Sequence, residues 1–342
     1  MKNVNFKFNP MLLFVFDTGM ADNPNTNTTT DSGMSAAMIK YYDKRLIKMA
    51  GPKLVYHEFA LKRPLPAHNG KTIVFHGWED LDTTPGNYKL TEGKTPDGQK
   101  LTAYDITATV APYGNYVELS DMVQTTAIDD TVVVAVDKLS AQASVVLDKL
   151  HRNELIADEE VDVSYAGGVA NADSLTVEKL LTVKELKKIV ARLRRVNAPT
   201  IDGKYPFIIH PDVAFDLSED PDYKEQIRYA DPKRFIDGYV GDLAGARLYE
   251  STNVKITKNA SGKPVYWNHL IGQDSYATVD LAGGALRTII KQPGSAGSAD
   301  PLDQRGSVAW KAASVTKVLI PKYIITFACS STIVPNEEDY ET

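Results

Sequence analysis

Two strand-like segments separated by a long polar stretch constrain the fold more than any other feature of the sequence. The strand patterns cover residues 72–78 and 101–110, and in the second of them Tyr104, Ile106 and Ala108 fall on one side. The residues between them, 80–102, are mostly polar and contain turn-forming Gly and Pro. A two-stranded ribbon on its own is marginal in water. We therefore predict a long hairpin that has to pack on a further surface, such as another subunit.

The N-terminal residues have the composition of an arm. Residues 21–31 contain almost no side chains able to enter a core, so we expect them to be extended. The apolar run at 11–16 is shorter than the hydrophobic region of a signal peptide and ends at Asp17, so we interpret it as a docking segment. Helical spacing predicts a helix over 32–50, ended by Gly51-Pro52. No run is long enough to span a bilayer.

A strand is predicted over 54–61, and a long amphipathic helix from Asp129 to about Arg152. At 1.5 Å per residue this helix would make a rigid axis of roughly 35 Å. Its apolar stripe consists of Val132, Val136, Leu139, Ala143, Val146 and Leu150. The residues expected to lie mostly away from that stripe are Asp130, Asp137, Ser144, Asp148 and Lys149.

A second amphipathic helix is predicted from Thr182 to about Val196. Thr182 and Glu185 have the spacing of a capping box, and apolar Leu186, Ile189, Val190 and Leu193 follow. Its other face is basic, with Lys187, Lys188, Arg192, Arg194 and Arg195. We interpret that face as salt-bridged or solvated, although it could meet phosphate or an acidic partner.

Beyond Lys204 the pattern changes to short strands and helices, which predicts an α+β module. Its segments are 205–210, 213–217, 222–229, 248–256, 267–272 and 276–281. The Gly- and Ser-rich residues 293–301 predict a flexible link or loop tip. Two last strands, 308–318 and 323–329, are expected to return to the earlier sheet, and the fold class is α+β.

Composition limits the function classes. The 342 residues contain 38 Lys and Arg against 44 Asp and Glu, a net charge of −6 that disfavours a protein coating nucleic acid through charge. The single cysteine, Cys329, excludes an intramolecular disulfide and is compatible with folding in the cytosol.

Short catalytic motifs have weak support. Asp17-Thr18-Gly19 and Asp31-Ser32-Gly33 resemble the triplets of aspartic proteases, but only the first follows an apolar run and no lobe fits between them. Gly70-Lys71-Thr72 and Gly93-Lys94-Thr95 end like phosphate-binding loops, but the preceding glycine of that motif is missing. We predict hairpin turns at both.

The titratable residues give no site either. The six histidines, His57, His68, His76, His151, His210 and His269, lack zinc-ligand spacing. His210, before Pro211-Asp212, is better explained by a structural turn than by a catalytic base. We predict no catalytic, cofactor-binding or metal-binding residues, and no enzyme activity.

In several short stretches the chain resembles the major capsid proteins of tailed phages with the Hong Kong 97 type of fold, in particular the family named after the podovirus N-four. The resemblance extends over most of the chain after residue 50, and the order of the stretches is more specific than any one of them. They are Leu90-Thr91-Glu92-Gly93-Lys94-Thr95-Pro96, Thr109-Val110-Ala111-Pro112-Tyr113-Gly114, Leu119-Ser120-Asp121, Asp129 at the start of the long helix, Ile209-His210-Pro211-Asp212 and Gly241-Asp242-Leu243-Ala244-Gly245-Ala246-Arg247-Leu248-Tyr249-Glu250-Ser251.

This resemblance implies a domain plan. Residues 1–52 would be the N-terminal arm and its helix, and 53–118 the extended β-hairpin loop that lies across a neighbouring subunit. Residues 119–204 would form the peripheral domain with its spine helix, 205–292 the axial domain, and 293–342 the return to the peripheral domain and the C-terminal tail. Lys89, Lys94 and Lys100 lie in the extended loop, but no amide partner for a cross-link is identified.

The resemblance also implies a function. The chain would be a major capsid protein that assembles in the host cytoplasm, as hexamers and pentamers, into the icosahedral shell around the double-stranded DNA of a tailed bacteriophage. Partners would be the portal protein and scaffold or decoration proteins; DNA would be enclosed without sequence recognition, and no membrane or cofactor is implied.

Three alternatives stay open on sequence alone. One is an encapsulin-like nanocompartment shell that encloses an enzyme, and another is a β-rich phage tail or decoration protein. The third is the aspartic protease, which fails if replacing Asp17 and Asp31 by alanine changes neither assembly nor any activity.

Overall fold

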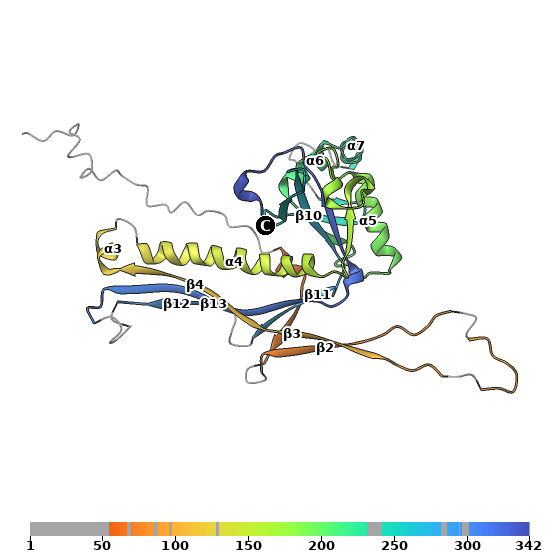
Figure 1. The fold of residues 1–342 in the computed structure, drawn as a ribbon, viewed down its shortest axis with the longest axis horizontal. Helices are drawn as coiled ribbons and strands as arrows, with labels where there is room; N and C mark the ends of the chain where they lie inside the picture. The colour runs from red at the N-terminus through yellow and green to blue at the C-terminus, as the bar shows by residue number, and fades with distance from the viewer. Residues whose placement is uncertain are drawn as a thin grey trace, which may run out of the picture. The chain divides into compact units, whose positions relative to one another are not determined.

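Two β-sheets, a separate β-hairpin, one long helix and several shorter helices make up the part of the chain that the structure describes (Figure 1). The computed structural model describes residues 55–341 except 67–69, 85–87, 96–97, 128–129, 231–240, 282–285, 294 and 296–300, and of 226–230 and 280–281 only the backbone. All of these belong to one unit, residues 49–342. The predicted arm and its helix, with both aspartate triplets and most of the predicted link at 293–301, lie outside the described residues.

The five-stranded sheet is organised around its longest strand, β13. Antiparallel β4 pairs with residues 305–314 of β13 on one side, while β12 and β11 pair on the other side and β1 adds to β11 in parallel. The strands are β1 (Leu61–Leu65), β4 (Ala111–Ser120), β11 (Tyr276–Leu281), β12 (Arg287–Lys291) and β13 (Arg305–Val318). Alternate residues of β13 are buried, so this sheet has one covered and one more open face.

The long helix α4 (Thr131–Ala157) covers one face of that sheet. The carboxylate of Asp130 accepts hydrogen bonds from the amides of Val132 and Val133 and caps its first turn. Leu139 and Ala143 of the predicted stripe pack with Val308, Trp310 and Ala312. The helix is confirmed, with 27 residues and a length of about 40 Å, and it ends beyond the predicted Arg152.

The prediction for Asp148 is wrong, since its side chain is buried although it was expected to lie away from the apolar stripe. The reason is that the last turns of α4 enter a different core from the first turns. Leu155, beyond the predicted end of the helix, packs with Tyr56, Ile208 and Ile271.

The seven-stranded sheet has the order β5-β14-β10-β6-β8-β7, with β9 also paired to β10. One face packs on α5 and α6 through Leu186, Ile189 and Val213, and the other packs on α2 and the end of α4. Because both faces are covered, every residue of β6 and β14 is buried. The strands are β5 (Asp162–Tyr165), β6 (Tyr205–Ile209), β7 (Asp242–Leu243), β8 (Ala246–Glu250), β9 (Lys255–Lys258), β10 (Pro264–Ile271) and β14 (Ile324–Cys329), and the helices are α5 (Val183–Arg195), α6 (Pro211–Glu219) and α7 (Pro221–Ala230).

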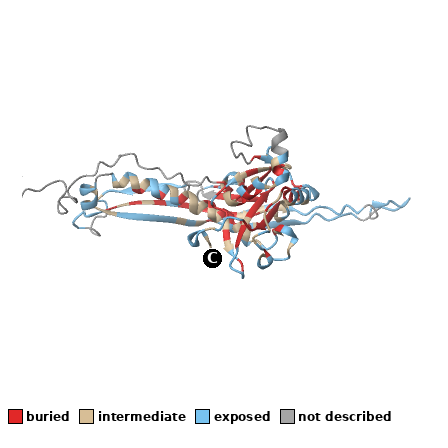
Figure 2. Ribbon diagram, turned by 90° about the horizontal axis from the view of Figure 1, so that it is seen from above, coloured by how far each residue is buried: buried red, intermediate tan, exposed pale blue. Residues whose placement is uncertain are grey.

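The predicted hairpin is confirmed. Strands β2 (Thr72–Trp78) and β3 (Ala103–Thr109) pair antiparallel from Thr72↔Thr109 to Trp78↔Ala103. The turn predicted at Gly93-Lys94-Thr95 is confirmed, because Gly93 has a left-handed φ of 77° and the Lys94 amide donates to the Thr91 carbonyl at 3.1 Å. The hairpin turn predicted at Gly70-Lys71-Thr72 is wrong: Gly70 has a φ of 80°, but it connects β1 and β2, which belong to different sheets. Figure 2 shows that the hairpin is exposed along most of its length.

Two predicted strands differ in the structure. Residues 54–61 were expected to be a strand, but Tyr56–Phe59 form the short helix α2 and the strand β1 follows it. The reason is a long-range cap from Asp148, described below. Residues 248–256 contain two strands, β8 and β9, because a turn at 252–253 separates them.

The two closing strands belong to different sheets. β13 pairs with β4, β11 and β12, whereas β14 lies between β10 and β5 in the other sheet. Hence β11 and β12, in the range predicted to be axial, share a sheet with β4. The domain boundaries given above stay predictions. Short segments complete the described fold: α3 (Asp121–Thr126) and the 3-10 turns Ala166–Gly168, Ala172–Ser174, Pro321–Tyr323 and Glu337–Asp339.

Candidate assembly site

The helix α2 is held at its N-terminal end by a side chain from α4. The residue before it, Val55, makes no side-chain cap. Instead Asp148 Oδ1 accepts hydrogen bonds from the amides of Tyr56 at 2.9 Å and His57 at 3.4 Å, while its Oδ2 accepts from Asn253 Nδ2 at 2.8 Å. Asp148 is thus a cap supplied from 92 residues away. It fixes the chain where residues 1–54 join the described fold.

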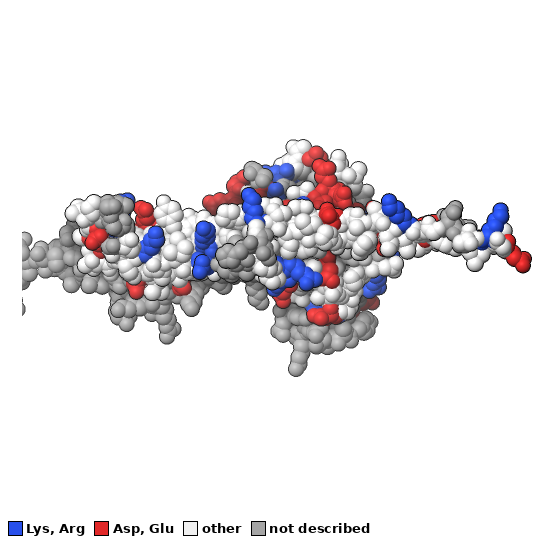
Figure 3. Space-filling model, turned by 90° about the horizontal axis from the view of Figure 1, so that it is seen from below, with Lys and Arg blue, Asp and Glu red and all other residues white. Residues whose placement is uncertain are grey.

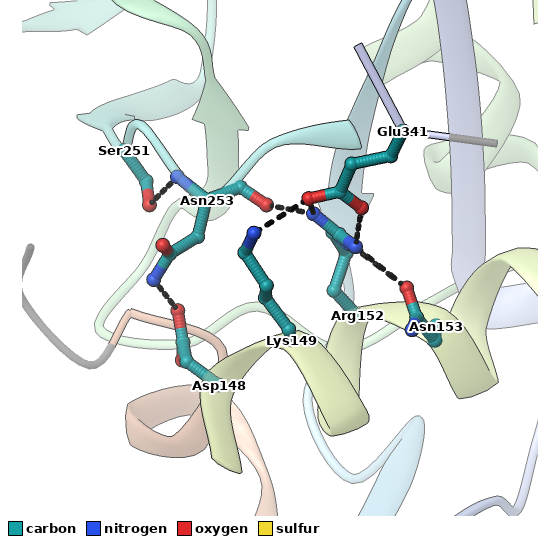
Figure 4. A network of polar contacts seen from close by, with 7 residues as sticks. All are labelled: Asp148, Lys149, Arg152, Asn153, Ser251, Asn253 and Glu341. Carbon is teal, nitrogen blue, oxygen red and sulfur yellow. Dashed lines mark hydrogen bonds and ion pairs between the residues drawn. The ribbon is translucent and has the colours of Figure 1, made fainter. Parts of the chain in front are cut away.

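Arg152, one turn further along α4, holds the C-terminal residues (Figure 4). Its side chain is 1% exposed, and its guanidinium donates to the Asn253 carbonyl at 2.5 Å and to both carboxylate oxygens of Glu341. Lys149 Nζ lies 2.7 Å from Glu341 Oε1. The two ends of the described chain therefore meet on the same two turns of α4.

The charge states of this junction follow from its surroundings. Burial raises the pKa of Asp148, and hydrogen bonds from Asn253 and the α2 amides oppose that rise. Partial burial would also raise the pKa of Glu341, but its bonds to Arg152 and Lys149 hold this pKa below the ordinary value. Burying the Arg152 cation costs the least free energy when Glu341 is paired with it and when the nearby Asp148 carboxylate keeps all its hydrogen-bond donors.

The fold brings together two histidines that are far apart in the sequence. His57 Nδ1 lies 3.2 Å from His151 Nε2, and the other ring nitrogen of His151 contacts the hydroxyl of Thr316. Tyr56 Oη lies 3.1 Å from His269 Nδ1, in the same buried layer. Burial lowers the pKa of both His151 and His269 to about 3, so both rings are neutral at pH 7.

Among the described residues, the other histidines considered as candidates form no site with one another. His210 caps α6, its Nδ1 accepting from the Asp212 amide at 3.2 Å, as the turn interpretation predicts. His76 contacts Asp105 on the exposed hairpin. His68 lies outside the described residues. Within the described ranges no group of three or more His, Cys, Asp or Glu could hold a metal ion, and no helix there is long and apolar enough to cross a membrane.

Large apolar side chains of the hairpin and its distal stretch lie in solvent. No residue of β2 is buried, and Trp78 is 65% and Leu90 70% exposed. The exposed set is Val74, Trp78, Leu81, Tyr88, Leu90, Leu101 and Tyr104. An exposed apolar surface of this extent marks an interaction surface.

The open face of the five-stranded sheet continues this pattern. Tyr116, Ala309 and Ile289 face one another across β4, β13 and β12, and Tyr116 is 61% exposed. Among the strands described, β4 and β12 have no partner along their outer edges. Free edges of this kind accept an added strand.

Charge is distributed without a continuous basic surface on the face that Figure 3 shows, where Lys and Arg lie in small groups among Asp and Glu. On α5, Arg192 pairs with Asp162 at 2.5 Å and Lys188 with Glu185 at 2.7 Å. The predicted capping box is half present, since Thr182 Oγ1 accepts from the Glu185 amide while the Glu185 carboxylate is bonded to Lys188.

Sequence reasoning did not identify the junction residues. The local patterns place them on a surface, a strand or the tail. These residues are Tyr56, His57, Asp148, Arg152 and Glu341. The available signal was Leu155, an apolar residue seven positions after Asp148, which extends the helical pattern and places Asp148 and Arg152 on a second buried face.

The arrangement of sheets, helix and hairpin is shared with solved capsids. The capsid of Ralstonia phage GP4 superposes with a TM-score of 0.66 at 14% identity, over 91% of this chain and 100% of that chain. The fold is that of phage capsid proteins. The capsid of cyanophage P-SCSP1u gives 0.65 at 13% identity, over 90% of this chain and 100% of that chain.

The capsid fold also occurs in an encapsulin complex from Synechococcus elongatus, which superposes with a TM-score of 0.55 at 11% identity, over 92% of this chain and 99% of that chain. No protein-family model matches the sequence, and no curated protein does. At identities this low, the superpositions establish the capsid fold and nothing further.

Proposed function

We propose that this chain is a major capsid protein that self-assembles into the icosahedral head shell around the double-stranded DNA of a tailed bacteriophage. One observation carries the proposal: within the capsid fold, the distal part of the hairpin leaves large apolar side chains such as Trp78 and Leu90 in solvent, whereas Ile73 and Phe75 nearer its base pack on the five-stranded sheet. A subunit that assembles into a lattice can bury such residues on its neighbours. A free monomer gains nothing from them.

The finer assignment is to the Hong Kong 97 type of capsid, in its podovirus N-four-like group. It rests on the sequence stretches between Leu90 and Ser251 and on the long helix, which would be the spine of the peripheral domain. The role is structural rather than catalytic. Subunits would form hexamers and pentamers in the host cytoplasm, with a portal protein and scaffold or decoration proteins as further partners.

The junction on α4 gives a physical account of how such a shell bears load. Force on the N-terminal residues reaches α4 through the Asp148 cap, and force on the C-terminal tail reaches it through Arg152 and Glu341. Both loads would therefore pass to α4, the longest helix of the described fold. Many interfaces, each weak, then hold a subunit whose own ends cannot loosen separately.

Electron microscopy of the protein expressed in bacteria tests the proposal. We expect closed polyhedral shells, either from the protein alone or together with the other head proteins. Tubes would indicate a tail protein instead. A chain that stays monomeric in both conditions, at every concentration reached, would contradict the proposal.

The encapsulin structure supports one second candidate, a nanocompartment shell. The contents of purified particles distinguish the two functions. Nuclease-protected double-stranded DNA in particles from infected cells is expected for the phage shell. A single enzyme identified by mass spectrometry, with no protected DNA, would favour the nanocompartment.

A further inference from the structure

A large groove lies where the far end of the paired strands β2 and β3 passes the segment between β13 and β14. Its volume is about 1330 Å³, and its walls come from Trp78 and Tyr104 of the hairpin, Asp158 and Glu160 after α4, and Val196 at the end of α5. The floor is the stretch from Val318 to Tyr323.

The groove has the chemistry of a receptor for cations. Its lining holds four carboxylates, Glu79, Asp80, Asp158 and Glu160, against two lysines, Lys317 and Lys322, so the groove is net negative. Lys317 is paired with Glu154 outside the lining, and none of the four carboxylates is ion-paired within the described ranges. Beside them lies the exposed ring of Tyr104. Guanidinium and ammonium groups bind carboxylates through charge and bind the face of a Tyr ring through its quadrupole.

The ring of Tyr104 is held in place by the hairpin itself. Gly77 lies directly opposite Tyr104, and a Cβ atom at position 77 would come within 2.3 Å of the Tyr104 ring. The ring therefore occupies the space that any other residue at 77 would fill. Trp78 follows with 65% of its surface exposed. Tyr104 is 40% exposed on the groove wall, whereas Trp78 pairs with Ala103 and so belongs to the opposite face of the ribbon.

The chain contains a matching surface on α5. Its exposed cations fall at intervals of three, four and seven residues, so they share one face of the helix. Among the described residues only Lys188 of this face has a carboxylate partner, Glu185. This set, the α5 basic face, consists of Lys184, Lys187, Lys188, Arg194 and Arg195.

The groove and the α5 basic face are adjacent, because Val196 immediately follows Arg195 and lines the groove. A positive surface beside a negative one is self-complementary under two-fold rotation. We propose that the groove of one subunit receives the α5 basic face of a second copy of this chain, in a two-fold contact between neighbouring subunits. The inference rests on the proposed function, since this contact would be one interface of the shell.

Nucleic acid is a weaker partner for the α5 basic face. The phosphate backbone would bring further negative charge next to four carboxylates that have no ion pair within the described ranges. A second copy of the chain instead places a basic face against each groove, so that the carboxylates and the α5 cations are paired in one contact. Because exposed charges are screened, the contact should weaken as salt is raised.

Charge reversal of the full-length protein tests the contact. One variant carries Asp80→Lys and Glu160→Lys, and a second carries Lys187→Glu and Arg195→Glu; all four side chains are exposed, so the subunit should fold. We expect each variant to raise the protein concentration needed for shell formation about tenfold, as measured by sedimentation and electron microscopy. A third variant with all four changes should return to within about threefold of the wild-type protein.

The matched control reverses two exposed cations on the open sheet face, Lys291→Glu and Lys311→Glu, and should not be rescued by the groove changes. The inference is overturned if either two-site variant assembles like the wild-type protein, or if the four-site variant assembles no better than its parents. Loss of DNA binding by Lys187→Glu/Arg195→Glu with unchanged assembly would assign the face to nucleic acid instead. Failure of the wild-type protein to form shells at all would count against the proposed function, not against the groove alone.

Discussion

The seven-stranded sheet and the hairpin use similar strand residues and differ in what covers them. Every residue of β6 and β14 is buried, because helices and the end of α4 pack on both faces of that sheet. No residue of β2 is buried, and the hairpin pairs only with itself. Apolar strand residues thus stabilise the subunit in the first region. In the second, Ile73 and Phe75 pack on the subunit's own five-stranded sheet, and the more distal apolar side chains, such as Trp78, stay exposed among the described residues.

The two tryptophans Trp310 and Trp78 provide the strongest test of this difference. Trp310 is 3% exposed, packs under α4 and donates through Nε1 to Gln142 at 3.2 Å. Trp310→Ala should lower the free energy of unfolding by about 3–5 kcal/mol through the cavity it leaves. Trp78→Ala should change it by less than about 0.5 kcal/mol and yet weaken shell assembly. Urea unfolding of the unassembled subunit and sedimentation of assembled particles give the two readings, and equal losses of stability would contradict the comparison.

The Asp148 cap should have the next largest effect. Asp148→Ala removes the acceptor of two α2 amides and of Asn253 in a buried site, so we expect a loss of about 3 kcal/mol. Hydrogen exchange should show early loss of protection at residues 56–59. Asp137→Ala, on the exposed side of the same helix, is the control and should stay within about 0.5 kcal/mol of the wild-type protein. Unchanged exchange at 56–59 in the Asp148 variant would show that the cap does not hold α2.

Acid should destabilise the buried junction in a predictable direction. The pKa of His151 and of His269 is about 3 in the folded subunit and about 6.5 in the unfolded chain. The unfolded chain therefore binds more protons, and stability falls as the pH drops below about 6.5 and continues to fall toward 3. At pH 5.5 each histidine should cost about 1.4 kcal/mol.

Urea unfolding between pH 7.5 and 5 measures this slope. The pKa of Asp148 is raised by burial, which opposes the loss in acid, so the histidines are isolated by comparing variants. His151→Gln and His269→Gln should each flatten the slope. Parallel slopes in the wild-type protein and both variants would show that the buried histidines do not set the pH dependence.

Helix caps should show the smallest difference between covered and exposed regions, here between α5, which has buried residues, and α3, which has none. Thr182 caps α5, which has five buried residues, so Thr182→Ala should lower the free energy of unfolding by about 1 kcal/mol. Ser120 caps α3, which has no buried residue. Ser120→Ala should therefore let α3 fray without changing the urea midpoint of the subunit. A larger shift from Ser120→Ala than from Thr182→Ala would reverse the comparison.

Local pattern was enough for most of the described elements. The hairpin, the long helix and the helix after Thr182 follow from alternation, helical spacing and capping residues, all of which are set within a few positions of the chain. The strand expected at 54–61 was wrong because the cap that makes Tyr56–Phe59 helical comes from Asp148, which no local pattern contains.

Alternation, helical spacing and turn residues were sufficient to locate the hairpin, the long helix and the helix after Thr182 from the order of the amino acids. Tertiary structure alone decided which polar residues are buried, and it did so by bringing together positions such as Arg152 and Glu341, 189 residues apart. The physical reason is that periodicity depends on neighbours along the chain, whereas desolvation and pKa depend on whatever the fold places beside a group.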